Sequence, residues 1–97
     1  MDNYNGKILP DTIIERNGDI PTVDLDGEIG MMSVAKGRYF CLDPVGSHIW
    51  RLLDQPKSLN DIISSLLNEY DVDKRTCEKQ VLDFVIELFD NGLILIK

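Results

Sequence analysis

The side chains that most often do chemistry are scarce in this chain, which has one histidine, His48, and two cysteines, Cys41 and Cys77. A catalytic histidine works on a nucleophile or beside a second acid–base group, and no serine or cysteine here stands in a recognisable nucleophile motif. A zinc site takes about four ligands, so one histidine and two cysteines 36 residues apart are too few. We therefore expect no catalytic residue and no metal site, with His48 an ordinary helical residue and the thiols small apolar fillers.

Acidic and glycine residues do not supply a site either. Asp24, Asp26 and Glu28 alternate beside a turn, a pattern typical of a solvated face, and they lack the glycine and terminal glutamate spacing of a calcium loop. No glycine-rich phosphate loop is present. The sequence predicts a protein that is not an enzyme and has no cofactor.

The length and the net charge of the chain limit which partners and which cellular location we expect. Ninety-seven residues form one small domain, and the net charge of −7 disfavours nucleic acid and anionic membranes as partners. No apolar run approaches the roughly 20 residues of a membrane span. Since residues 1–20 lack the basic and apolar regions of a signal peptide and cysteines are few, we expect a reduced, cytoplasmic protein.

The first half of the chain predicts strands. Residues 22–25, 28–34 and 38–42 read as extended runs, joined by turns at Asp26-Gly27 and Lys36-Gly37. They form an antiparallel meander with residues 28–34 in the middle and residues 38–42 at an edge. Residues 1–20 contain only one strand-like run, residues 12–15, and are interpreted as an N-terminal arm that precedes a domain of residues 21–97.

The second half predicts three helices. Asp43-Pro44 starts a helix over residues 44–53, and Ser58 caps the next, whose apolar residues recur at three- and four-residue spacing up to Tyr70. The third begins near Asp73 or Thr76 and ends at Asn91, followed by Gly92 and an apolar tail. Three strands followed by three helices indicate an α+β domain with the helices on one side of the sheet.

Two features offer more binding surface than one core needs. The third helix carries a second apolar stripe, formed by Leu82, Ile86 and Phe89, beside its first one. Either the arm or the C-terminal tail covers this stripe, or it lines a groove for a partner. The edge strand, residues 38–42, has no proline and one charge, so an extended peptide could add to it, unless residues 12–16 already occupy that edge.

These segments resemble the PqqD-like family, the recognition elements that bind leader regions of ribosomally synthesised, post-translationally modified peptides (RiPPs). The resemblance covers about residues 21–94 and is carried by the ordered runs Asp26-Gly27-Glu28, Gly37–Asp43, Gly46–Leu53 and Gly92-Leu93. Asp43 stands where the family often has Asn, which preserves the N-cap. The resemblance implies a fold similar to a winged helix-turn-helix and a leader bound as an added strand between the third strand and third helix. The implied peptide-binding residues are Arg38, Tyr39, Phe40, Cys41 and Leu42 on the strand, and Leu82, Val85, Ile86 and Phe89 on the helix.

Because the chain begins with Met and ends soon after Gly92-Leu93, it looks like a stand-alone member of this family. With its Gly-Arg-Tyr hairpin and the Tyr70–Asp73 link, it is similar to the leader-binding subunit of lasso peptide biosynthesis. The resemblance implies that such a subunit delivers the precursor peptide to a separate leader protease and an ATP-dependent cyclase. Two alternatives stay open. One is a PqqD-type chaperone of quinone cofactor synthesis. The other is a winged-helix DNA-binding regulator, disfavoured by three cationic against five anionic residues over residues 73–91.

Overall fold

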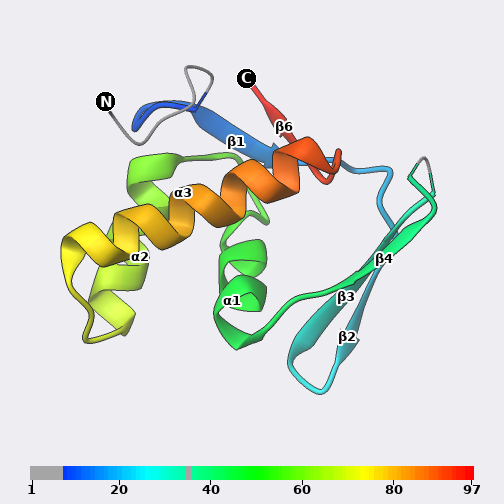
Figure 1. Cartoon of the computed structure of the whole chain (residues 1–97), viewed down its shortest axis with the longest axis horizontal. Helices are drawn as coiled ribbons and strands as arrows, with labels where there is room; N and C mark the ends of the chain where they lie inside the picture. Colours follow the sequence, from blue (N-terminus) through cyan, green and yellow to red (C-terminus); the bar gives the residue numbers. More distant parts are fainter. Residues whose placement is uncertain (1–7, 35) are drawn as a thin grey trace.

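The computed structural model describes residues 8–34 and 36–97, which form two small sheets and three helices (Figure 1). Along the chain the elements are β1 (Ile13–Arg16), β2 (Thr22–Leu25), β3 (Glu28–Ser33), β4 (Arg38–Cys41), α1 (Pro44–Leu52), β5 (Lys57–Ser58), α2 (Leu59–Glu69), α3 (Lys74–Asp90) and β6 (Ile94–Ile96). One sheet has the order β2-β3-β4 and the other β5-β1-β6. The fold is α+β, and the predicted three-stranded meander and three helices are confirmed.

The turn between β2 and β3 forms because Asp26 and Gly27 both adopt positive φ, 57° and 95°. The Asp24 carboxylate accepts a 2.6 Å hydrogen bond from the Gly27 N–H. Arg51 of α1 donates to the Gly27 carbonyl at 2.7 Å and forms a 3.2 Å ion pair with Asp24. These contacts fasten the tip of the meander to α1.

Each helix begins at an N-cap carboxylate or hydroxyl that accepts the N–H three residues later. The capping residues are Asp43 for α1, Ser58 for α2 and Asp73 for α3, with distances of 2.7, 3.1 and 3.0 Å. The third helix ends where Gly92 takes a φ of 74° and the Leu93 N–H returns to the Leu88 carbonyl at 2.9 Å. These starts and stops follow the boundaries predicted from the sequence.

The second sheet was not predicted from the sequence, which indicated an N-terminal arm over residues 1–20 lying against a domain of residues 21–97. β1 pairs with β5 on one side and β6 on the other, and Ile8 and Ile14 are fully buried. Residues 8–20 are therefore built into the domain, whereas residues 1–7 of the predicted arm lie outside the described residues. Sequence patterns missed this sheet because β5 has two residues and β6 three, too few for a visible alternation.

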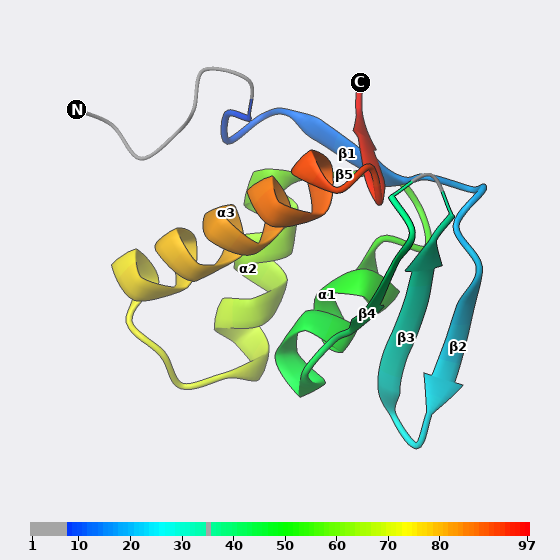
Figure 2. The ribbon, with the colours of Figure 1, turned by 45° about the vertical axis from the view of Figure 1, so that its right-hand side comes forward.

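The helices pack on one side of the meander, with α1 between that sheet and the α2–α3 pair (Figure 2). The shared core draws on every helix and both sheets, through residues such as Ile14, Met31, Trp50, Ile62 and Val85. Arg16 of β1 crosses to α1, where it donates to the Trp50 carbonyl at 2.6 and 3.1 Å and lies over the indole ring. The second sheet and the tip of the meander thus hold the same, C-terminal end of α1, through Trp50 and Arg51.

Candidate functional site

The outer edge of β4 is unpaired within the described part of the chain. β4 ends the order β2-β3-β4, and residues 13–16 pair with β5 and β6 in the other sheet. The alternative in which residues 12–16 cover this edge is therefore wrong. An unpaired edge leaves a row of main-chain donors and acceptors that a further strand can satisfy.

The register fixes which residues present these groups. The Leu42 N–H donates to the Ile29 carbonyl at 2.8 Å, and Phe40 lies opposite Met31. Because hydrogen-bonded and non-hydrogen-bonded pairs alternate in an antiparallel ladder, Phe40 bonds to β3. The N–H and C=O groups of Tyr39 and Cys41 consequently point away from β3, toward the open edge.

A buried serine secures the end of this ladder. Ser47 of α1 is fully buried, and its hydroxyl accepts the Ile29 N–H at 2.9 Å and donates to the Leu42 carbonyl at 3.3 Å. The hydroxyl takes the place of a direct strand–strand bond, so β3, the end of β4 and α1 share one hydrogen-bonded junction. This junction fixes the position of the open edge relative to the helices.

A groove of about 270 Å³ lies between β4 and the C-terminal half of α3. Its strand side is formed by Phe40, Cys41, Leu42 and Asp43, and its helix side by Phe84, Glu87, Leu88 and Asn91, with Leu93 beside them. Arg38 lies over the Phe40 ring at 5.5 Å. The groove therefore combines an unpaired strand edge with a helical wall of two apolar and two polar residues, between the predicted strand and the predicted helix.

The strand residues of the predicted site divide into two faces. Phe40 is half-buried and Leu42 buried, and both line the groove. Tyr39 is 55% exposed on the opposite face of the sheet, where its hydroxyl occupies the space that a Cβ on Gly30 would need. Cys41 is exposed, and the Arg38 guanidinium lies over the Phe40 ring. Tyr39 can thus offer a peptide its main chain, while Phe40 and Leu42 offer side chains.

On α3 the predicted wall residues are not those that line the groove. Leu82 and Val85 are 2% and 0% exposed, and neither lines the groove, so their binding of a peptide stays a prediction. Ile86 and Phe89 are half-buried and packed against the core, and neither lines the groove. With 3.6 residues per turn, Leu82, Ile86 and Phe89 lie on roughly the opposite side of α3 from Phe84.

The apolar residues that line the helix side of the groove, Phe84 and Leu88, belong to the first apolar stripe of α3, which also contains Val81 and Val85. Phe84 and Leu88 share the periodicity of the core positions Val81 and Val85, so spacing alone could not separate them. Glu87 and Asn91 are polar and gave no apolar signal. Gly46, a glycine within a predicted helix, is the one signal in the sequence for this side of α3. In the structure a Cβ at Gly46 would lie 3.1 Å from the Phe84 ring, so the glycine allows α3 to approach α1 closely.

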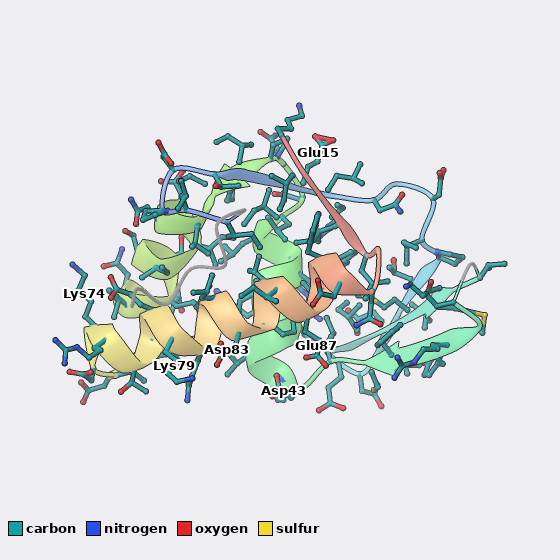
Figure 3. All side chains as sticks on the ribbon, turned by 45° about the horizontal axis from the view of Figure 1, so that its top comes forward. Glu15, Asp43, Lys74, Lys79, Asp83 and Glu87 are labelled. Carbon is teal, nitrogen blue, oxygen red and sulfur yellow. The ribbon has the colours of Figure 1, made fainter. Side chains whose placement is uncertain are left out.

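Charge at the groove is acidic. Asp43 and Glu87 line it, and none of the lysines and arginines in the described part of the chain does. Figure 3 shows Asp43 at the start of α1 and Glu87 on α3 on the same side of the molecule. In a chain with a net charge of −7, this favours a ligand that carries cationic side chains.

The other side chains that could take part in chemistry lie apart from the groove or have structural roles. His48 is half-buried, with its ring edge-on to Tyr70 at 5.9 Å. Burial, with a smaller contribution from Glu78, raises the pKa of the Cys77 thiol and disfavours its thiolate. Among residues 8–34 and 36–97 no group of three or more His, Cys, Asp or Glu side chains is placed to hold a metal ion. None of the described helices is both long and apolar enough to cross a bilayer.

Two carboxylates near the helices have lowered pKa values. For Asp24 the main cause is the Gly27 N–H, followed by the Arg51 side chain. For Asp73 the main cause is the Thr76 N–H that it caps, followed by the Thr76 hydroxyl. Both shifts come from hydrogen bonds that hold the fold, at the meander tip and at the start of α3, and neither carboxylate lines the groove.

Comparison with known proteins agrees with this geometry. The family profile described as Coenzyme PQQ synthesis protein D (PqqD) matches residues 28–94. The solved structure "TbiB1 in Complex with the TbiA(beta) Leader Peptide" is 32% identical, with a TM-score of 0.76, over 82% of this chain and 93% of that one. A second, "Lasso peptide synthetase B1 complexed with the leader peptide", is 26% identical, with a TM-score of 0.72, over 84% of this chain and 96% of that one. No curated protein sequence matches the chain. Since the family profile spans more than two thirds of its residues, the protein belongs to the PqqD family and has the fold of a PqqD-like RiPP recognition element.

Proposed function

We propose that this protein binds the leader region of a ribosomally synthesised precursor peptide, which adds to the outer edge of β4 as a further strand. The observation that carries the proposal is the unpaired Tyr39 and Cys41 main chain beside the groove. Main-chain hydrogen bonds would supply affinity without regard to sequence, and the wall formed by Phe84 and Leu88 would select apolar side chains.

The two solved relatives support this assignment, since each is a complex with a leader peptide and the chain covers more than nine tenths of each. One of them is a lasso peptide synthetase B1. We therefore assign the protein to lasso peptide maturation, as a non-catalytic cytoplasmic subunit. In this role it would deliver the bound precursor to a leader protease and an ATP-dependent cyclase.

Electrostatics gives the proposal a salt dependence. Asp43 and Glu87 line the groove, and residues 8–34 and 36–97 add no basic residue to its lining, so a lysine- or arginine-containing leader would be attracted. Exposed charges are screened beyond a Debye length of about 8 Å at physiological ionic strength. Association should accordingly be faster at low salt than at high salt.

Calorimetric titration with the synthetic leader peptide of a lasso peptide precursor tests the proposal. One-to-one binding that requires the leader segment, and is absent for the remaining part of the precursor, is expected. If the folded protein takes up no leader peptide at low or physiological salt, the assignment is wrong.

A second candidate is the PqqD-type chaperone of quinone cofactor synthesis, favoured by the description of the matching family profile. It would use the same strand edge with a different precursor. Parallel titrations with a lasso leader and with a precursor peptide of the quinone cofactor pathway separate the two. Preference for the second peptide would transfer the assignment to cofactor synthesis.

A further inference from the structure

The meander carries opposite charges at its two ends. β3 runs between two turns, one after β2 and one before β4, which lie at its opposite ends (Figure 2). The first turn is acidic, with three carboxylates over residues 24–28, whereas the only charged side chains of residues 29–42 are Lys36 and Arg38, at the second turn. A strand of six residues is about 17–20 Å long, and the Debye length at physiological ionic strength is about 8 Å. A ligand along β4 therefore meets two separate charged ends.

Arg38 brings the basic end to the groove. Residues 38, 40 and 42 point to the same side, because side chains alternate along an extended chain, and Phe40 and Leu42 line the groove. The Arg38 guanidinium lies over the Phe40 ring at 5.5 Å. Arg38 therefore extends the strand side of the groove beyond Phe40, at the opposite end from Asp43.

The Arg38 side chain is oriented by this ring and not by an acceptor. Two other arginines, Arg16 and Arg51, donate hydrogen bonds to carbonyl or carboxylate oxygens of the fold. Among residues 8–34 and 36–97, none forms an ion pair or a side-chain hydrogen bond with the Arg38 guanidinium. A guanidinium is a planar fork of N–H donors whose geometry matches a carboxylate. The stacked fork of Arg38 is thus available to a carboxylate of a ligand.

We propose that Arg38 is a specificity-determining residue, which binds an aspartate or glutamate side chain of the leader. The inference rests on the proposed function and adds a charge requirement to it. The leader residue opposite Arg38 is acidic, and a residue about four positions away, beside Asp43 and Glu87, is basic. The order of these charges also selects the direction of the leader, with the basic residue first in an antiparallel added strand and the acidic residue first in a parallel one.

Charge and geometry favour a peptide carboxylate as the occupant. An isolated exposed ion pair contributes little free energy, so a free anion would bind Arg38 weakly. A leader held by main-chain bonds to β4 brings its side chain to Arg38 without a further loss of translational freedom. Asp43 and Glu87 repel an anion at the other end of the groove, so the carboxylate is favoured only beside Arg38.

Leaders with exchanged charges test the proposal. The synthetic leader peptide of a lasso peptide precursor is made in two series, with Glu or with Lys at one position at a time. Each peptide is titrated calorimetrically into the unmodified protein and into Arg38→Glu. Lys74→Glu is the matched control, because it makes the same change in net charge at an exposed residue about 20 Å along α3 from Glu87 (Figure 3).

At one leader position the unmodified protein should bind the Glu peptide about 2- to 5-fold more tightly than the Lys peptide, as expected of an exposed ion pair. Arg38→Glu should invert this preference, and Lys74→Glu should keep it. Arg38→Gln, which removes the charge without reversing it, should abolish the preference and serves as the second variant if Arg38→Glu lowers Tm. The preference should fade at 1 M salt, where the Debye length is about 3 Å.

The basic half of the requirement has its own variant, Glu87→Lys. At a second leader position, about four residues from the first, the unmodified protein should prefer Lys to Glu, and Glu87→Lys should remove that preference. A preference that persists in Glu87→Lys would refute this half.

The outcomes separate the charge requirement from leader recognition. If no leader position changes its preference between the unmodified protein, Arg38→Glu and Arg38→Gln, the contact with Arg38 is refuted while leader recognition stands. If the unmodified protein binds none of the leaders, recognition itself is refuted and the contact with it.

Discussion

A proline scan of β4 distinguishes the two edges of this strand. Proline removes one main-chain N–H and is tolerated in an edge strand only where that N–H faces away from the ladder. The register directs the Cys41 N–H outward and the Phe40 N–H toward Met31 of β3. Cys41→Pro should therefore impair strand addition alone, whereas Phe40→Pro should damage the fold.

The expected magnitudes follow from the hydrogen bonds involved. In the complex, Cys41→Pro forfeits one main-chain bond, about 0.5–1.5 kcal/mol, and its ring also obstructs a strand laid beside β4. Together these should weaken leader binding at least roughly tenfold relative to Cys41→Ala. Phe40→Pro leaves the Met31 carbonyl without its partner, which costs about 1–3 kcal/mol of folding free energy relative to Phe40→Ala. In a domain of this size that lowers Tm by on the order of 10 °C.

The assay pairs thermal unfolding with calorimetric titration of the leader for the four variants, so that the alanine forms account for the lost side chains. The free energy of unfolding of Cys41→Pro should lie within about 0.5 kcal/mol of that of Cys41→Ala, while its affinity for the leader is lower. Full affinity in Cys41→Pro would refute strand addition at β4. Unfolding in Cys41→Pro but not in Phe40→Pro would refute the register.

Three further predictions concern the fold that presents the groove. Ile86→Asp and Phe89→Asp place a charge on half-buried side chains packed against the core, so urea titration should find the free energy of unfolding lowered by about 1–3 kcal/mol; loss of leader affinity at unchanged stability would instead restore them to the binding site. Ser47→Ala leaves one buried N–H and one carbonyl at the end of the β3–β4 ladder without the bridging hydroxyl and should cost about 1–3 kcal/mol in the same assay; no change would contradict the bridge. The pKa values of Asp24 and Asp73 lie below 3.8, so the stabilising effect of these carboxylates is present above that pH and is lost as the pH falls through the lowered values. The difference in stability between Asp73→Asn and the unmodified protein should therefore shrink as the pH is lowered from 7 to below 3.8, and a difference that does not change with pH would contradict a charge effect.

Local signals were sufficient to predict most of the fold. The Asp26-Gly27 turn, the Asp43 and Ser58 caps and the Gly92 stop each act within four residues, and all lie where the sequence indicated. The β5-β1-β6 sheet depends on contacts between residues about 45 and 80 positions apart, Ile14 with Lys57 and with Ile96. No local pattern encodes such pairings, so the sequence alone predicts an arm for the N-terminal segment.

The site was predicted in part for the same reason. The edge strand could be located because strand order follows from consecutive hairpins. Which flank of α3 faces that edge depends on how the helix is rotated against α1 and the second sheet, and two apolar stripes allow two rotations. Close packing of Phe84 on Gly46 selects one of them, and it turns Leu82 inward.

Amide hydrogen exchange measured residue by residue, with and without the synthetic leader, tests the central claim most directly. An added strand should slow exchange at Tyr39 and Cys41, whose N–H groups point outward, and should change Phe40 and Leu42 far less, since these are already bonded to β3. Protection in this alternating pattern is the predicted result. A leader that binds without slowing exchange at Tyr39 and Cys41 would contradict strand addition at β4.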